Sequence, residues 1–132
     1  MNHKITLVTM SLLSIVLSIF HITDDIVRGI EPGDTGTLTF ILIATVLLYG
    51  TLPLADRRAG FIIMLLGGIG GVLVAYVHMR GGGLVGGRIA GTSGMFFWVF
   101  TLIALGTTGM MTAILAAQAL WRSFRRPDAA TP

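Results

Sequence analysis

Hydrophobic positions gather into four long stretches that contain no Asp, Glu, Lys or Arg. These stretches are residues 5–22, 35–55, 59–77 and 95–121. Each is close to the roughly 20 residues that an α-helix needs to cross the hydrocarbon core of a bilayer. The pattern therefore predicts an all-α protein, an integral membrane four-helix up-down bundle.

Polar residues beside these stretches extend or end the expected helices. Residues 21–28 keep a helical period, Gly29 is the expected residue just past the helix end, and Pro32 follows it. We expect helices at about 5–28, 35–54, 57–79 and 94–124. Residues 1–126 then form one transmembrane domain, and residues 127–132 form a disordered cytoplasmic tail.

Composition supports a membrane protein and excludes several classes of chemistry. The chain has 132 residues, of which 54% are hydrophobic and 11% charged, and its mean hydropathy is +0.87. It has no cysteine, which excludes disulfides, thiolate metal sites and thiol catalysis. The net charge is +3, and the basic residues that produce it lie at the ends of apolar stretches. In that position basic residues set membrane topology, so we expect no nucleic-acid partner.

The basic residues predict an orientation. With the N-terminus inside, the inner side holds Lys4, Arg57, Arg58, Arg122, Arg125 and Arg126. The outer side then holds Arg28, Arg80 and Arg88. Because positive residues favour the cytoplasmic side, we expect both termini in the cytoplasm and the protein in the plasma (inner) membrane. Aromatic residues near the outer face, Trp98 among them, are expected in the interfacial belt.

One polar constellation lies at the expected outer end. Spacings of three, four and seven residues place four ionisable side chains on one face of the first helix, and the third helix brings two more to the same end. These candidate ligand-binding residues are His21, Asp24, Asp25, Arg28, His78 and Arg80. Ionisable groups at this depth are functional candidates by default.

Imidazole nitrogen and carboxylate oxygen suit a divalent metal such as zinc or iron, so His21, Asp25 and His78 are candidate metal ligands. The same groups are able to relay protons. Alternatively, the charges lie among the lipid headgroups and form ordinary surface ion pairs. Two histidines on different helices also allow haem ligation, which the nearby carboxylates disfavour.

Small residues recur at four-residue spacing on two helices and predict close packing. The two rows are Gly67, Gly71 and Ala75, and Gly109, Ala113 and Ala117. They pack on each other or on a second copy or membrane partner. The glycine-rich segment 81–86 matches G-x-G-x-x-G, but a membrane helix precedes it where a nucleotide site needs a strand. We therefore expect no nucleotide.

No motif names a reaction, and three functions stay open. The first is binding or helping to transport a small polar ligand, proton or metal at the outer His/Asp cluster in the lipid bilayer. The second is a structural or accessory subunit that associates through the glycine faces. The third is a membrane metal-dependent hydrolase, which is the least favoured because no nucleophile is identifiable.

Overall fold

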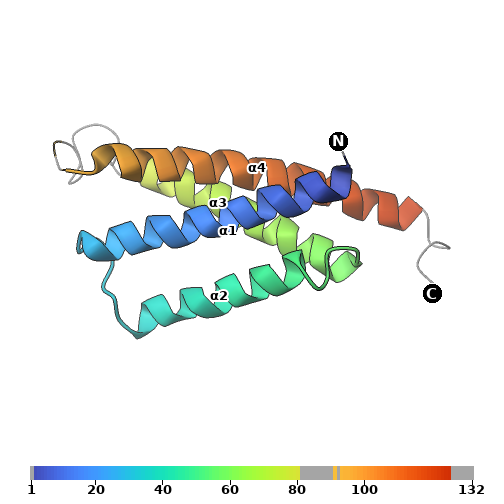
Figure 1. The fold of residues 1–132 in the computed structure, drawn as a ribbon, viewed down its shortest axis with the longest axis horizontal. Coiled ribbons are helices and arrows are strands. Elements are labelled where there is room, and N and C mark those ends of the chain that lie inside the picture. The colour runs from blue at the N-terminus through green and yellow to red at the C-terminus, as the bar shows by residue number, and fades with distance from the viewer. Residues whose placement is uncertain (1, 81–90, 92, 126–132) are drawn as a thin grey trace.

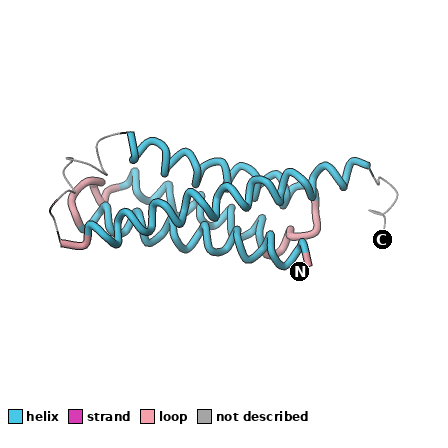
Figure 2. Tube along the Cα trace, turned by 90° about the horizontal axis from the view of Figure 1, so that it is seen from above, coloured by secondary structure: helices cyan, strands magenta, loops and turns pink. Residues whose placement is uncertain are grey.

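The computed structural model describes residues 2–80, 91 and 93–125. This part of the chain folds into four α-helices and contains no strand (Figure 1). They are α1 (His3–Val27), α2 (Thr35–Thr51), α3 (Arg58–Arg80) and α4 (Met95–Arg125). The helices run side by side and alternate in direction, as Figure 2 also shows. The predicted all-α four-helix bundle is confirmed. The expected tail at residues 127–132 lies outside the described residues.

Three of the four helices, α1, α3 and α4, are long and apolar enough to cross a membrane. At 1.5 Å per residue they extend about 38, 35 and 47 Å, against a hydrocarbon core of about 30 Å. Helix α2 has 17 residues and reaches about 26 Å. It ends at Thr51 rather than at the expected residue 54 because Pro53 has no N–H to donate and disfavours helix in the residue before it.

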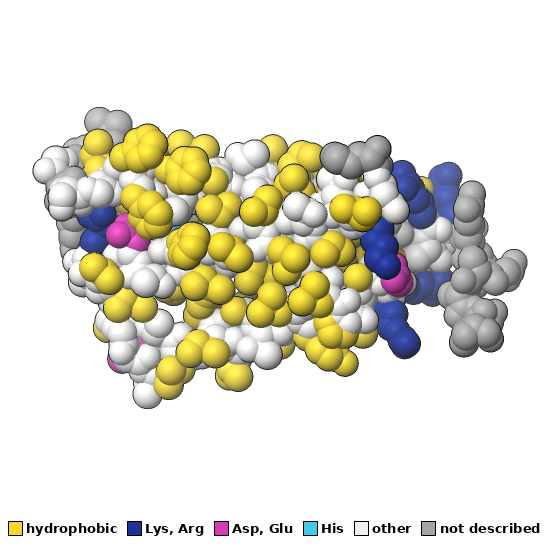
Figure 3. Space-filling view, in the orientation of Figure 1, with side chains coloured by type: hydrophobic (Ala, Val, Ile, Leu, Met, Phe, Trp, Pro, Cys, Tyr) yellow, Lys and Arg dark blue, Asp and Glu magenta, His cyan; other side chains and the backbone are white. Residues whose placement is uncertain are grey.

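On the face shown in Figure 3, hydrophobic side chains cover much of the surface between the two charged ends, and no Lys, Arg, Asp or Glu of the described residues is seen there. Large hydrophobic side chains are exposed on every helix; Leu42 is 68% exposed and Phe96 is 82% exposed. So many exposed large hydrophobic side chains mark contact with a membrane or a partner. It fits helices whose outer faces meet lipid.

Helices α3 and α4 pack with their backbones in close contact. A Cβ atom on Gly68 would lie 2.6 Å from the carbonyl oxygen of Gly109 and 2.7 Å from the backbone nitrogen of Ala113. A Cβ on Gly109 would lie 2.8 Å from the carbonyl oxygen of Gly68. Only glycine permits this approach, and dispersion contacts between small residues are what hold helices together in lipid.

The predicted small-residue rows occupy this interface in part. Gly71 and Ala75 are buried against α4. Gly67 instead faces Leu47 of α2, and its neighbour Gly68 takes the central position on α3. Ala117 is exposed. Gly71 and Ala75 of one row and Gly109 of the other therefore lie in an interface within one chain.

The C-terminus of α1 is fixed by a glycine turn, as its sequence predicts. Gly29 has a positive φ of 68°. The N–H of Gly29 donates to the carbonyl of Ile26, and the N–H of Ile30 donates to the carbonyl of Asp25. This pair of bonds is a Schellman motif. Ile30 also packs against the buried cluster that contains Trp98, so the last turn of α1 is held in place.

The two ends of the bundle differ in chemistry. We call the end where α1 and α3 finish and α4 begins the cluster end, and the opposite end, which holds both termini in Figure 1, the terminal end. At the terminal end Lys4 pairs with Asp56, and the guanidinium of Arg58 donates to the carbonyl of Ser123. Figure 3 shows Lys and Arg side chains gathered there.

Candidate cation site

Three ionisable side chains converge at the cluster end and define what we call the His/Asp cluster: His21, Asp25 and His78. His21 and Asp25 are one turn apart on α1, and His78 comes from the last turn of α3. Asp25 Oδ2 lies 3.6 Å from His21 Nε2 and 3.5 Å from His78 Nε2. One ligand atom from each residue lies within 4.8 Å of the other two. The sequence predicted that these residues share one end, and the structure brings their ligand atoms together.

Two members of the His/Asp cluster are buried and the third is partly exposed. The side chains of His21 and Asp25 are only 4% and 3% exposed. The side chain of His78 is 28% exposed. His78 is therefore the ligand candidate closest to the surface, while Trp98 and Thr101 of α4 lie against the other two.

Two residues of α4 that were not predicted to belong to the site complete it. The indole Nε1–H of Trp98 donates to Asp25 Oδ1 at 2.7 Å. Trp98 is 2% exposed, so it is a core residue and not part of an interfacial aromatic belt. Thr101, one turn later, lies 3.3 Å from His21 Nδ1 through its Oγ1. The sequence offered one sign of their role: a Trp and a Thr lie three residues apart, on one helix face, at the same end as the two histidines.

Hydrogen bonding fixes the tautomer of His78. Its Nδ1 lies 2.9 Å from the carbonyl oxygen of Val74. A carbonyl only accepts, so Nδ1 carries the hydrogen. In a neutral imidazole the lone pair is then on Nε2, which is the atom that faces Asp25 Oδ2.

The same reasoning assigns His21. The hydroxyl of Thr101 donates its single hydrogen to the carbonyl of Trp98 at 3.0 Å. It is therefore an acceptor toward His21 Nδ1, which carries the hydrogen. The lone pair of neutral His21 lies on Nε2, and this buried atom has no hydrogen-bond partner among the described residues.

When both imidazoles are neutral, three lone-pair atoms thus face one another with no hydrogen between them. Neutral Nε2 atoms and an ionised carboxylate repel at close range, and an unsatisfied buried acceptor costs about 1–3 kcal/mol. The separations of 3.5 and 3.6 Å exceed the 2.7–3.2 Å of an ordinary N–H···O bond. They are near the roughly 3.3 Å edge of a tetrahedron with metal–ligand bonds of about 2.0–2.1 Å. A cation placed among them relieves the repulsion.

The other predicted ligand-binding residues make different contacts. Asp24 accepts a hydrogen bond from Arg28 Nε at 2.7 Å, in the expected i,i+4 pairing. The guanidinium of Arg80 lies over the ring of Tyr76, 4.9 Å from its centroid. Asp24, Arg28 and Arg80 place further charge at the same end of the bundle as the His/Asp cluster.

No protein-family model, curated protein or solved structure matches this chain. The chemistry of the site is therefore the basis for a function. Two imidazole nitrogens and one carboxylate oxygen form a three-ligand set that leaves a fourth position open, as in zinc sites that bind water or a substrate.

Proposed function

We propose that this protein is an integral membrane protein that binds a divalent transition-metal ion at the cluster end. The ligands are His21 Nε2, His78 Nε2 and Asp25 Oδ2. The observation that carries the proposal is the convergence of these three lone-pair atoms in a buried site, with both histidine Nδ1 hydrogens directed elsewhere.

The charge balance supports a cation. The Trp98 indole stabilises one oxygen of Asp25, and the other oxygen lies 3.6 Å from His21 Nε2 and 3.5 Å from His78 Nε2. A buried carboxylate without a counter-charge is expensive. A divalent ion supplies that charge, and two nitrogen ligands favour zinc or a similar metal over magnesium or calcium, which prefer oxygen.

The surrounding hydrogen bonds support the same assignment. Metal-binding histidines commonly donate their second ring N–H to a carbonyl or another oxygen, which orients the ring. His78 donates to the Val74 carbonyl and His21 to the Thr101 hydroxyl. Trp98 orients Asp25 in the same way. All three ligands are thus held by a second set of contacts.

We place the cluster end on the outer side of a plasma membrane, with both termini in the cytoplasm. The positive residues support this orientation: Lys4 and Arg58 lie at the terminal end, together with the basic last turn of α4. The ion would then be taken up from the outer side. The protein serves as a binding or transport-associated component in the lipid bilayer.

Thermal unfolding of the detergent-purified protein in a series of divalent metals tests the proposal. A ligand that binds only the folded state raises the midpoint temperature as its concentration rises. At 100 times Kd it adds about 2.7 kcal/mol to the free energy of unfolding. We expect a saturable shift with zinc that His21→Ala and His78→Ala both abolish.

His3 provides the matched control, because it is a histidine at the terminal end of the same bundle. His3→Ala should keep the full shift. Equal shifts in His21→Ala and in the unsubstituted protein would show that the metal binds elsewhere. No shift with any metal would remove the metal site and leave a proton as the cation.

A further inference from the structure

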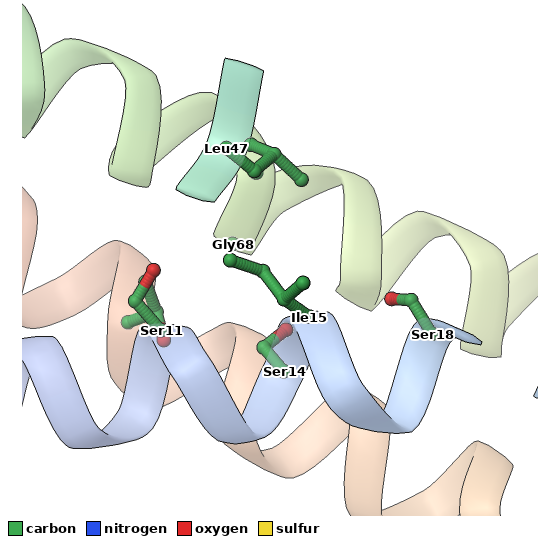
Figure 4. Close-up of a pocket in the computed structure, with 8 residues that line it drawn as sticks. Ser11, Ser14, Ile15, Ser18, Leu47 and Gly68 are labelled. Carbon is green, nitrogen blue, oxygen red and sulfur yellow. The ribbon is translucent and has the colours of Figure 1, made fainter. Parts of the chain in front are cut away.

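A small cavity lies between the helices of the bundle. The serines of α1 line it beside Leu47 of α2 and Gly68 of α3 (Figure 4), and its volume is about 20 Å³. A water molecule needs about 10–15 Å³, so the cavity has room for a single water. A partner larger than water is excluded from it, whereas the terminal end of the bundle presents an exposed charged surface.

Basic side chains are concentrated at the terminal end. The described residues place five of them there, against the single carboxylate of Asp56. Lys4 pairs with Asp56, which leaves four guanidinium groups without a carboxylate partner in the described part of the chain. We call these four residues the arginine surface: Arg57, Arg58, Arg122 and Arg125.

A contact between α3 and α4 brings the arginine surface together. The guanidinium of Arg58, at the start of α3, donates to the carbonyl of Ser123 in α4 at 2.8 Å. It also lies over the ring of Phe124, 5.0 Å from its centroid. The other three arginines are sequence neighbours of these residues, so all four lie around one contact. Figure 3 shows the resulting group of basic side chains at this end.

The aromatic residue Trp121 indicates the depth of the arginine surface in a bilayer. It lies in the last turns of α4, and it is 61% exposed. Exposed Trp side chains near the end of a membrane helix are typical of the headgroup region. Helix α4 extends about 47 Å, against a hydrocarbon core of about 30 Å, so its last turns reach beyond that core. The arginine surface therefore lies at the level of the lipid headgroups.

The guanidinium groups keep hydrogen-bond donors available at this level. Arg125 lies over the ring of Trp121, 4.8 Å from its centroid. A stacked guanidinium contacts the ring with its flat face, so its N–H groups stay free to bind in the plane. Arg57 and Arg122 are exposed and make no hydrogen bond or ion pair with the described residues. These donors suit phosphate, which a guanidinium binds through two parallel bonds.

We propose that the arginine surface is a binding site for the headgroup of an anionic phospholipid. The excess positive charge favours this class of lipid, because a zwitterionic headgroup carries an ammonium that offsets its own phosphate. Each basic side chain near an anionic membrane surface strengthens association by up to about fivefold. The acyl chains of the bound lipid lie along the apolar sides of the helices. The proposal rests on the bundle lying in a bilayer and does not use the metal site.

Native mass spectrometry of the full chain in detergent micelles tests the proposal, because it resolves bound lipids by their mass. The probes are phosphatidylglycerol and phosphatidylcholine with the same acyl chains. We expect phosphatidylglycerol to bind about tenfold more tightly. Arg57→Gln/Arg122→Gln should reduce this preference to less than about threefold, and Arg57→Lys/Arg122→Lys should keep most of it, because lysine retains the charge. Neither arginine makes a described contact that holds the fold, so a loss reports lipid binding.

Two stacked arginines at opposite ends of the bundle provide a matched pair. Arg125 lies over Trp121 at the terminal end, and Arg80 lies over Tyr76 at the cluster end. Arg125→Gln should weaken phosphatidylglycerol binding by up to about fivefold, and Arg80→Gln should leave it unchanged.

Several outcomes would overturn the proposal. They are equal binding of the two lipids, a preference that survives in Arg57→Gln/Arg122→Gln, and an equal loss in Arg80→Gln and Arg125→Gln. Displacement of phosphatidylglycerol by excess inorganic phosphate would also overturn it, because the surface would then bind a free anion instead of a lipid. None of these outcomes changes the metal titration of the His/Asp cluster, so the two proposals fail separately.

Discussion

The hydrogen bond from Trp98 to Asp25 offers a quantitative test of the site. The indole Nε1 lies 2.7 Å from Asp25 Oδ1, and both residues are 2% exposed. A hydrogen bond to a charged group contributes about 1.5–3 kcal/mol. Trp98→Phe removes the donor and leaves a buried carboxylate oxygen without a partner, while most of the aromatic surface stays.

A double-mutant cycle separates this bond from packing. The smaller ring loses some packing in any background, about 1–2 kcal/mol of free energy of unfolding. In the Asp25→Ala background, Trp98→Phe should cost only that packing term, because the acceptor is absent. The expected coupling energy is therefore about 1.5–3 kcal/mol, above the roughly 0.6 kcal/mol average for hydrogen bonds between membrane helices.

The four proteins of the cycle are the unsubstituted chain, Trp98→Phe, Asp25→Ala and the double variant. Their free energies of unfolding are measured in mixed micelles of a mild detergent and increasing dodecyl sulfate, with a chelator present so that no metal contributes. Additivity within about 0.5 kcal/mol would refute the reasoning, because independent sites combine that closely. It would mean that the indole does not hold the carboxylate.

Two further predictions concern the helix interface and the imidazoles. Gly68→Ala should destabilise the bundle by about 2–3 kcal/mol, because the new Cβ would lie 2.6 Å from the backbone of α4. Gly70→Ala is the control and should be neutral or slightly stabilising, because nothing lies within 4 Å of its Cβ position. Equal unfolding free energies for the two variants would contradict the close packing. Nitrogen-15 NMR of the metal-free protein at neutral pH should show His21 and His78 with hydrogen on Nδ1, and zinc should shift their Nε2 signals; hydrogen on Nε2 in either residue would contradict the hydrogen-bond assignment.

The sequence was sufficient to predict the helices because their chemistry is local. Four uncharged apolar stretches separated by turn residues leave few alternatives in a bilayer. The end of α2 was misplaced by about a turn, since the apolar stretch continues past Pro53 while the helix does not. Gly29 was identified correctly because a helix end with Gly and a following Pro has one common geometry.

The candidate site was only partly predictable. The i,i+4 spacing brought His21 and Asp25 together, and counting residues along α3 placed His78 at the same end. The role of Trp98 was not accessible because the lipid-facing side of a membrane helix is as apolar as its buried side. The pattern alone therefore does not fix how α4 is rotated about its axis. The same ambiguity placed Gly67, rather than Gly68, in the α3–α4 interface.

X-ray absorption at the zinc edge of the metal-loaded protein tests the central claim most directly. It reports the identity and distance of the ligands. We predict one zinc per chain with two imidazole nitrogens at about 2.0–2.1 Å and oxygen ligands at about 2.0–2.2 Å, and loss of bound zinc in the His21→Ala/His78→Ala variant. A spectrum without imidazole scattering, or zinc retained in full by the double variant, would contradict a metal site at His21, Asp25 and His78.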